Sequence, residues 1–216
     1  YHGWHDWYLA ANINNKPPLF KYKGVPKSLK NTAYPFKYNL INQLKDLLIK
    51  KKIRIIFMEV TRNEMPKNNF LKKIRKLADK TNSVLIFDEC TSGFRVSLGG
   101  IYKKFNIAPD LIVYGKSLGN GYPINAVLGK KKIMQNEKNT FISSTFWSDR
   151  VGPVAALATL RLMKRKNFFK TIVENGKYIK KKWRELAKKN KLKIKVYGLD
   201  TLPRYEIISK NWELYR

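Results

Sequence analysis

The fold is decided by residues 85–129, which read LIFDECTSGFRVSLGGIYKKFNIAPDLIVYGKSLGNGYPINAVLG. Two short apolar runs in and next to this stretch, residues 84–88 (VLIFD) and 111–114 (LIVY), are rich in β-branched and aromatic residues. An earlier run at residues 53–60 (IRIIFMEV) has the same character. Runs of this length and composition, bounded by polar or turn residues, predict strands buried on both faces of a sheet.

Amphipathic helical patterns lie between these predicted strands. Residues 39–50 and residues 70–80 each place five apolar side chains on one helix face. The two faces consist of Leu40, Ile41, Leu44, Leu47 and Leu48, and of Phe70, Leu71, Ile74, Leu77 and Ala78. Buried strands that alternate with such helices predict an α/β fold with a mostly parallel sheet.

The rest of the chain continues this alternation and then changes character. Residues 126–129 predict a further short strand, and residues 152–164 and 168–189 predict two more helices. From Lys193 onward, the runs KIKVYG and RYEIIS alternate like strands of a second, smaller unit.

Each of the three long apolar runs ends at an ionisable group. Glu59 closes the first run, Asp88 and Glu89 close the second, and Lys116 follows the third. In a parallel α/β sheet the ligand crevice lies at the carboxyl ends of the strands. A carboxylate such as Asp88 is costly to bury unless it meets a positive partner. The run GKSLGNGYP at residues 115–123 surrounds Lys116 with glycines, which permit close backbone approach and positive φ angles.

Four short motifs follow one another in residues 85–129. They are Asp-Glu, Gly-Phe-Arg, Pro-Asp-Leu and Gly-Lys, and 28 positions separate Asp88 from Lys116. This series resembles the cofactor-binding signature of class III pyridoxal-phosphate-dependent aminotransferases, including glutamate-1-semialdehyde 2,1-aminomutase-like members. The resemblance implies a fold-type I PLP-transferase large domain that binds pyridoxal 5'-phosphate (PLP). It also implies that Lys116 is catalytic and forms the Schiff base, while Asp88 keeps the pyridine nitrogen protonated.

The resemblance assigns cofactor-binding roles to three further residues. Tyr1 opens the family's Tyr-His-Gly, whose tyrosine stacks on the pyridine ring; the alternative is an aromatic that packs on a core. Cys90 lies where the family places an aliphatic residue against the opposite ring face, and a thiol is a small apolar substitute. Thr145 matches the threonine that binds the cofactor phosphate of the neighbouring subunit, which implies a homodimer; the alternative is a helix-entry threonine.

The chain departs from the family pattern in two places. Residues 148–150 (SDR) replace the usual Gly-Asn-Pro, which puts the local loop and the substrate pocket in doubt. Val60 replaces the proline that follows the family's glutamate at position 59. Glu59, Asn63 and Glu64 are therefore candidates for substrate or cofactor contact.

Two arginines and two histidines lie close to these motifs. We interpret Arg62 and Arg95 as structural ion-pair partners in preference to clamps for a substrate carboxylate. His2 and His5 lie near no cysteine or further histidine with metal-ligand spacing, so the sequence predicts no metal site.

The resemblance covers the chain from Tyr1 to about Leu162 and extends more loosely beyond it. We expect residues 1–165 to be a PLP-binding large domain that lacks its N-terminal part. Residues 166–216 are expected to be a helix and the start of a truncated small α+β domain. The sequence opens without Met, and the family's phosphate-binding loop lies upstream of this start. The 216 residues alone are therefore expected to be inactive, with activity in the full-length protein.

The expected reaction is amino-group transfer between an amino donor and a carbonyl acceptor, both small molecules. Transaminase and aminomutase remain open, as does a PLP-binding relative without activity. A basic nucleic-acid-binding protein is a further alternative, because 45 Lys and Arg against 15 Asp and Glu give a net charge of +30. The lysines are spread over nearly all polar segments, which favours solvated faces over a nucleic-acid stripe.

Cysteine content and hydropathy indicate the compartment. A single cysteine forms no intrachain disulfide, which fits a reducing environment. The chain contains no run of about 18 apolar residues and no visible signal peptide, so a cytoplasmic protein without a membrane partner is expected.

Overall fold

The computed structural model describes residues 1–3, 5–13, 24–165 and 167–210, and it divides the chain into two compact units. The first unit comprises Tyr1–Phe57 and Pro66–Leu85, and the second comprises Met58–Met65 and Ile86–Arg216. The domain boundary expected between residues 165 and 166 stays a prediction.

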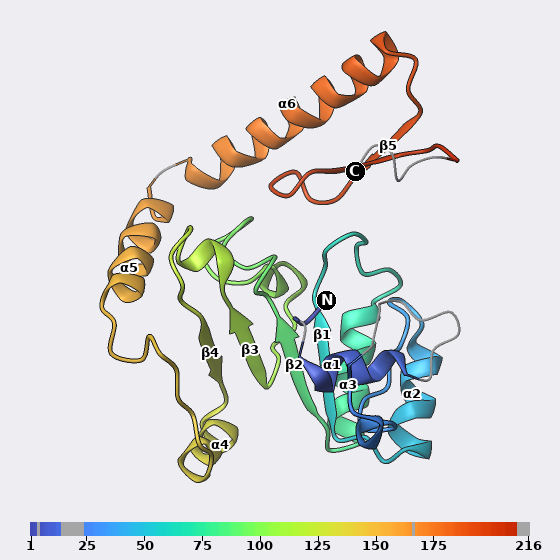
Figure 1. The fold of residues 1–216 in the computed structure, drawn as a ribbon, viewed down its shortest axis with the longest axis vertical. Helices are drawn as coiled ribbons and strands as arrows, with labels where there is room; N and C mark the ends of the chain where they lie inside the picture. The colour runs from blue at the N-terminus through green and yellow to red at the C-terminus, as the bar shows by residue number, and fades with distance from the viewer. Residues whose placement is uncertain (4, 14–23, 166, 211–216) are drawn as a thin grey trace. The chain divides into compact units, whose positions relative to one another are not determined.

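The main sheet has the strand order β1-β2-β3-β4 (Figure 1). Its strands are β1 (Ile55–Glu59), β2 (Val84–Asp88), β3 (Leu111–Tyr114) and β4 (Ala126–Gly129). Strand β3 pairs in parallel with β2 and antiparallel with β4. The predicted α/β architecture is confirmed. Strand β1 is shorter than the predicted run, because it begins at Ile55 instead of residue 53 and ends at Glu59 instead of residue 60.

The first unit contains α1 (Asp6–Leu9) and a pair of packed helices, α2 (Ile41–Lys50) and α3 (Phe70–Lys80). Helix α3 connects β1 to its neighbour β2, which is the crossover that a parallel strand pair requires. The buried side chains of the two helices are Leu44 and Leu48 of α2 and Phe70, Leu71, Ile74 and Ala78 of α3. Leu40, expected on the apolar face, is 51% exposed because α2 begins only after it.

The second unit continues after β4 through helices and a hairpin. These are α4 (Lys131–Met134), α5 (Val151–Met163), α6 (Phe168–Lys189), and the antiparallel pair of β5 (Ile194–Tyr197) with β6 (Arg204–Ile207). The two late helices and the tail strands predicted from the sequence are confirmed. Within the described ranges, no helix combines the length and the apolar composition needed to cross a membrane.

Helix α6 is fastened to the loop between β5 and β6. Lys180 Nζ donates hydrogen bonds to the backbone oxygen of Gly198 at 2.6 Å and to Asp200 Oδ1 at 3.0 Å. One turn earlier on the helix, a Cβ atom at Gly176 would overlap the backbone oxygen of Asp200. Glycine at position 176 therefore lets the loop lie directly on the helix.

We predict that Gly176→Ala destabilises the second unit. Overpacking a close contact costs about 1–3 kcal/mol, which exceeds the gain of up to about 1 kcal/mol in helix propensity. Urea unfolding of the full-length protein measures the change, and Asn175→Ala at the exposed neighbouring position is the matched control. Equal stability of the two variants would contradict the contact.

Candidate active site

Asp88 and the segment that carries Lys116 lie at the same edge of the main sheet. Asp88 is the last residue of β2 and is directly opposite Val113 of β3 in the parallel register. Lys116 begins the short helix η4 (Lys116–Leu118), two residues after β3 ends at Tyr114. Asp88 is 7% exposed, and its Oδ1 accepts a hydrogen bond of 2.9 Å from the backbone nitrogen of Cys90. The adjacent parallel strands thus bring a buried carboxylate and a lysine segment to one place.

The side chain of Lys116 reaches back toward the loop that follows β2. Its Nζ donates to Thr91 Oγ1 at 3.0 Å and lies 3.5 Å from Cys90 Sγ. The predicted residues Lys116 and Cys90 are therefore in direct contact. Thr91 is a further contact that the sequence did not reveal, because neither residue spacing nor periodicity predicts a bond across 25 positions.

The backbone at Lys116 is unusual. Its φ angle is +39°, in the left-handed region that costs a residue with a Cβ about 1–2 kcal/mol. The glycines were expected to take such angles, and Gly121 does so with φ +110°, but Lys116 itself adopts one as well. Strained backbone of this kind is typical of functional sites, where it aims a side chain.

Gly115 permits the close packing beneath Lys116. A Cβ atom at position 115 would lie 2.8 Å from Cys90 Sγ and would overlap Asn125 Oδ1. A larger residue at position 115 would displace the side chains of Asn125 and Cys90. The close backbone approach predicted for the glycine-rich run is thus found at Gly115.

Glu89 is a second buried carboxylate, with 0% exposure, and it organises the loop that holds Thr91. Its Oε2 accepts from Ser92 Oγ at 2.7 Å and from the backbone nitrogen of Ile101 at 3.0 Å. Its Oε1 accepts from the backbone nitrogen of Tyr102 at 2.9 Å. Burial raises the pKa of the Glu89 carboxyl above its usual value, and these hydrogen bonds oppose the shift.

Glu89 was identified from the sequence only as a strand-end charge. The two-residue period of a strand could have predicted the burial of Glu89, because position 89 lies on the same face as the buried residues Leu85 and Phe87.

The residues around Glu59 form a local cluster in the second unit. Arg62 NH1 pairs with Glu59 Oε1 at 3.1 Å, which confirms the structural ion pair expected for Arg62. Thr61 Oγ1 donates to the backbone oxygen of Glu64 at 2.6 Å, and the side chains of Asn63 and Glu64 are exposed. Contacts of these residues with a substrate or cofactor stay predictions.

The roles predicted for Thr145 and Tyr1 toward the cofactor stay predictions. Thr145 lies in the segment 140–150, whose side chains are all exposed. Tyr1 belongs to the first unit, where its ring packs edge-on against Tyr8 with centroids 5.9 Å apart. Arg95, unlike Arg62, forms no ion pair among the described residues, so the expectation of a structural ion pair is wrong for it. The described part of the chain also contains no group of His, Cys, Asp or Glu residues that could hold a metal.

Residues 27–212 match the family model described as aminotransferase class-III. The chain belongs to the class III aminotransferase family. Two curated relatives are a 3-aminobutyryl-CoA aminotransferase of Cloacimonas acidaminovorans and a glutamate-1-semialdehyde 2,1-aminomutase of Wigglesworthia glossinidia brevipalpis. The first relative is 36% identical, over 82% of this chain and 42% of the relative's length. The second is 35% identical, over 94% of this chain and 49% of the relative's length. The chain thus spans about half the length of the curated relatives it matches.

Solved structures show the same fold. The FumI protein of Sphingopyxis sp. MTA144, solved in its PLP internal aldimine form, aligns with a TM-score of 0.81 and 26% identity over 99% of this chain and 51% of its own. An omega-transaminase from Sphaerobacter thermophilus aligns with a TM-score of 0.77 and 21% identity over 96% and 51%. The predicted fold-type I transferase architecture of this class III chain is confirmed.

We predict that Thr91→Val in the full-length protein, prepared free of PLP, makes Lys116 more reactive toward acetic anhydride. The hydrogen bond to Thr91 holds the lysine side chain against the loop, and the amine must leave this position to meet the reagent. Losing a bond of about 0.5–1.5 kcal/mol should speed acetylation about twofold to tenfold. Peptide mass spectrometry gives the rate, with Lys130 as internal reference because its Nζ pairs with Asp110 at 2.6 Å. Thr91→Ser should restore the original rate, and an unchanged rate in Thr91→Val would contradict the contact.

A pH dependence of stability follows from the raised pKa of Glu89. A carboxyl with a raised folded pKa favours folding most below its unfolded pKa of about 4.3 and loses this contribution as pH rises through the folded pKa. The stability of the wild type minus that of Glu89→Gln should therefore fall as pH rises from 4. Urea unfolding between pH 4 and 8 measures it, and Glu206→Gln, at an exposed strand position, is the control. A difference that is flat with pH would rule out the titration.

Proposed function

We propose that the full-length protein is a PLP-dependent aminotransferase or aminomutase of class III, with Lys116 as the residue joined to the cofactor. One observation carries the proposal. The amine of Lys116 is held beside Cys90 at the edge of the sheet where the buried carboxylate of Asp88 ends the neighbouring strand. Membership of the family and the fold support the same conclusion.

The groups at this edge fit the needs of PLP, which acts as an electron sink for the carbanion formed on an amino substrate. Asp88 is buried, and its carboxylate would be the partner of a protonated pyridine nitrogen. Cys90 offers a small apolar surface next to Lys116. Gly115 has no Cβ, so the side chains of Cys90 and Asn125 can pack directly against the backbone next to Lys116.

Lys116 also moves a proton in the proposed reaction. Its Nζ would take the proton from the substrate carbon as general base and return it as general acid. Thr91 is placed to accept a hydrogen bond from that free amine, as it does here at 3.0 Å. The lysine amine thus has a defined hydrogen-bond partner when it is free.

The remaining parts of the site are proposed on the resemblance to the family. Tyr1 would cover the other face of the ring, and Thr145 would bind the phosphate of the neighbouring subunit in a homodimer. The exposure of segment 140–150 is compatible with a role toward a second subunit. The substrates would be a small amino donor and a carbonyl acceptor, and we place the protein in the cytoplasm on its single cysteine.

The decisive experiment fixes the cofactor to the lysine. Full-length protein is mixed with PLP, reduced with borohydride and digested, and the pyridoxyl mass is expected on the peptide that contains Lys116. Lys116→Ala should lose this mass and lower kcat by about 10³-fold or more, since it removes both attachment and proton transfer. Asp88→Asn should keep the mass but lower kcat by about 10²- to 10³-fold.

A screen of amino donors and carbonyl acceptors separates the possible outcomes. Transfer between two substrates indicates a transaminase, and rearrangement within one substrate indicates an aminomutase. Labelling of Lys116 with no turnover of any donor would indicate the inactive relative considered for residues 148–150. Labelling that persists in Lys116→Ala would refute the assignment of the lysine.

A further inference from the structure

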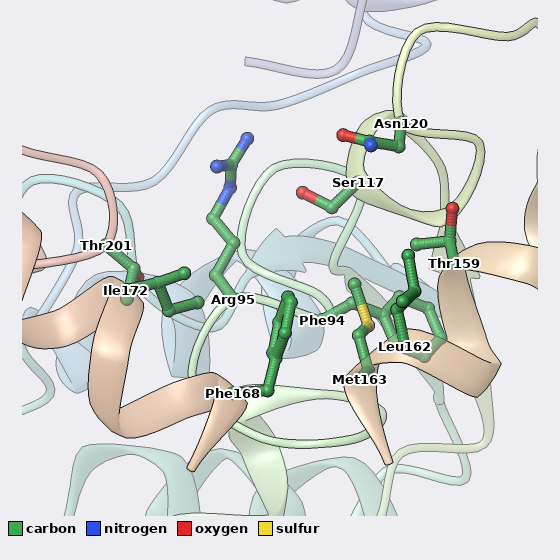
Figure 2. A pocket seen from close by; sticks show the side chains of 10 residues that line it. All are labelled: Phe94, Arg95, Ser117, Asn120, Thr159, Leu162, Met163, Phe168, Ile172 and Thr201. Carbon is green, nitrogen blue, oxygen red and sulfur yellow. The ribbon is translucent and has the colours of Figure 1, made fainter. Parts of the chain in front are cut away.

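A cavity of about 210 Å³ lies in the second unit, next to the helix η4 that begins with Lys116 (Figure 2). It is smaller than the roughly 300–1,000 Å³ of pockets for drug-sized ligands, so its occupant would be a small molecule. The lining side chains are five polar and five apolar ones: Arg95, Ser117, Asn120, Thr159 and Thr201, and Phe94, Leu162, Met163, Phe168 and Ile172.

Arg95 supplies an unneutralised positive charge to this cavity. Its Nε donates to the backbone oxygen of Thr91, and none of the carboxylates in the described ranges pairs with its guanidinium. Arg95 is half-buried, and this burial lowers the pKa of its guanidinium. A desolvated cation without an anionic partner is costly, and a bound anion would remove that cost.

Other polar groups of the cavity are also available to a ligand. Thr201 Oγ1 is buried and forms no hydrogen bond within the described ranges. The side chains of Ser117 and Asn120 form no hydrogen bond or ion pair within the same ranges. In Figure 2 the tips of Arg95, Ser117 and Asn120 lie toward one end of the cavity. Arg95 and Ser117 are half-buried and Asn120 is exposed, so these groups line the open end of the cavity, where a ligand can reach them.

The opposite part of the cavity is apolar. Phe94 and Phe168 lie there in Figure 2, together with Met163 at the end of α5. Phe94 and Met163 are buried, with 9% and 6% exposure. An occupant must therefore combine an anionic group for Arg95 with a short apolar body.

The cavity differs from the predicted cofactor site. Asp88, Cys90 and Lys116 do not line it, and Lys116 Nζ is directed to Cys90 and Thr91 instead. The two are nevertheless linked, because Ser117 follows Lys116 directly and the backbone nitrogen of Asn120 donates to the oxygen of Lys116 at 3.0 Å. A ligand in the cavity would contact the segment that positions the lysine.

We propose that this cavity binds a small monocarboxylate with a short aliphatic chain, its carboxylate on Arg95 and its chain between Phe94 and Phe168. Ser117 and Asn120 donate to the carboxylate oxygens. The site goes beyond the proposed amino-group transfer, and its occupancy requires no PLP. Binding therefore tests it separately from the assignment of Lys116.

Isothermal titration of the full-length protein with hexanoate, in the absence of PLP, tests the proposal. We expect saturable binding of hexanoate. Hexan-1-ol lacks the carboxylate and acetate lacks the aliphatic chain, so each should bind at least about tenfold more weakly. Arg95→Gln should weaken hexanoate at least about tenfold, the value of a hydrogen bond to a charged group. Arg161→Gln, at an exposed position of α5 outside the cavity, should leave the affinity unchanged.

Two further measurements keep the test decisive. Ile172→Trp fills the cavity, leaves Arg95 in place and should abolish binding. This second variant decides the test if circular dichroism shows that Arg95→Gln is misfolded. If the amino donor competes with hexanoate, the carboxylate that binds here belongs to a substrate. If it does not compete, the cavity binds a separate ligand, and both outcomes support the site. Absent hexanoate binding, equal binding of hexan-1-ol, or unchanged binding in both cavity variants would overturn the proposal.

Discussion

The parallel pairing of β2 with β3 is the constraint on which the site depends. Parallel strands present their carboxyl ends at the same edge, so Asp88 and the turn after Tyr114 are neighbours although 28 positions separate Asp88 from Lys116. The backbone hydrogen bond from Glu89 to Val113, at 2.9 Å, extends this pairing one residue past β2. Slippage by one residue would exchange the faces of the sheet to which Asp88 and Glu89 belong.

Two adjacent carboxylates therefore have opposite tasks. Glu89 is directed into the core. Its carboxylate oxygens accept hydrogen bonds from the following loop, from Ser92, Ile101 and Tyr102. Asp88 ends β2 at the carboxyl edge of the sheet, and its Oδ1 accepts from the backbone nitrogen of Cys90. The loop fixed by Glu89 carries Thr91 and Arg95, so one buried carboxyl supports both the lysine contact and the charged wall of the cavity.

Much of this arrangement could be predicted from the sequence, since it depends on short-range pattern. Hydrophobic runs located the strands, and the motifs in residues 85–129 located Asp88 and Lys116. What escaped prediction depends on tertiary geometry: the bond from Lys116 to Thr91, and an Arg95 without an ion pair. The exposure of Leu40 was missed because a helical pattern marks a face but does not fix the first residue of the helix.

The left-handed backbone at Lys116 has a consequence for how such a chain can change over time. Glycine or asparagine would adopt that conformation with less strain, so replacing this lysine relaxes the backbone while deleting the amine. Random mutation removes the lysine, and its replacement by glycine or asparagine lowers the backbone strain. Selection for the chemistry of the amine opposes both effects. Descendants released from that selection would be expected to lose Lys116 early and to fold at least as well afterwards.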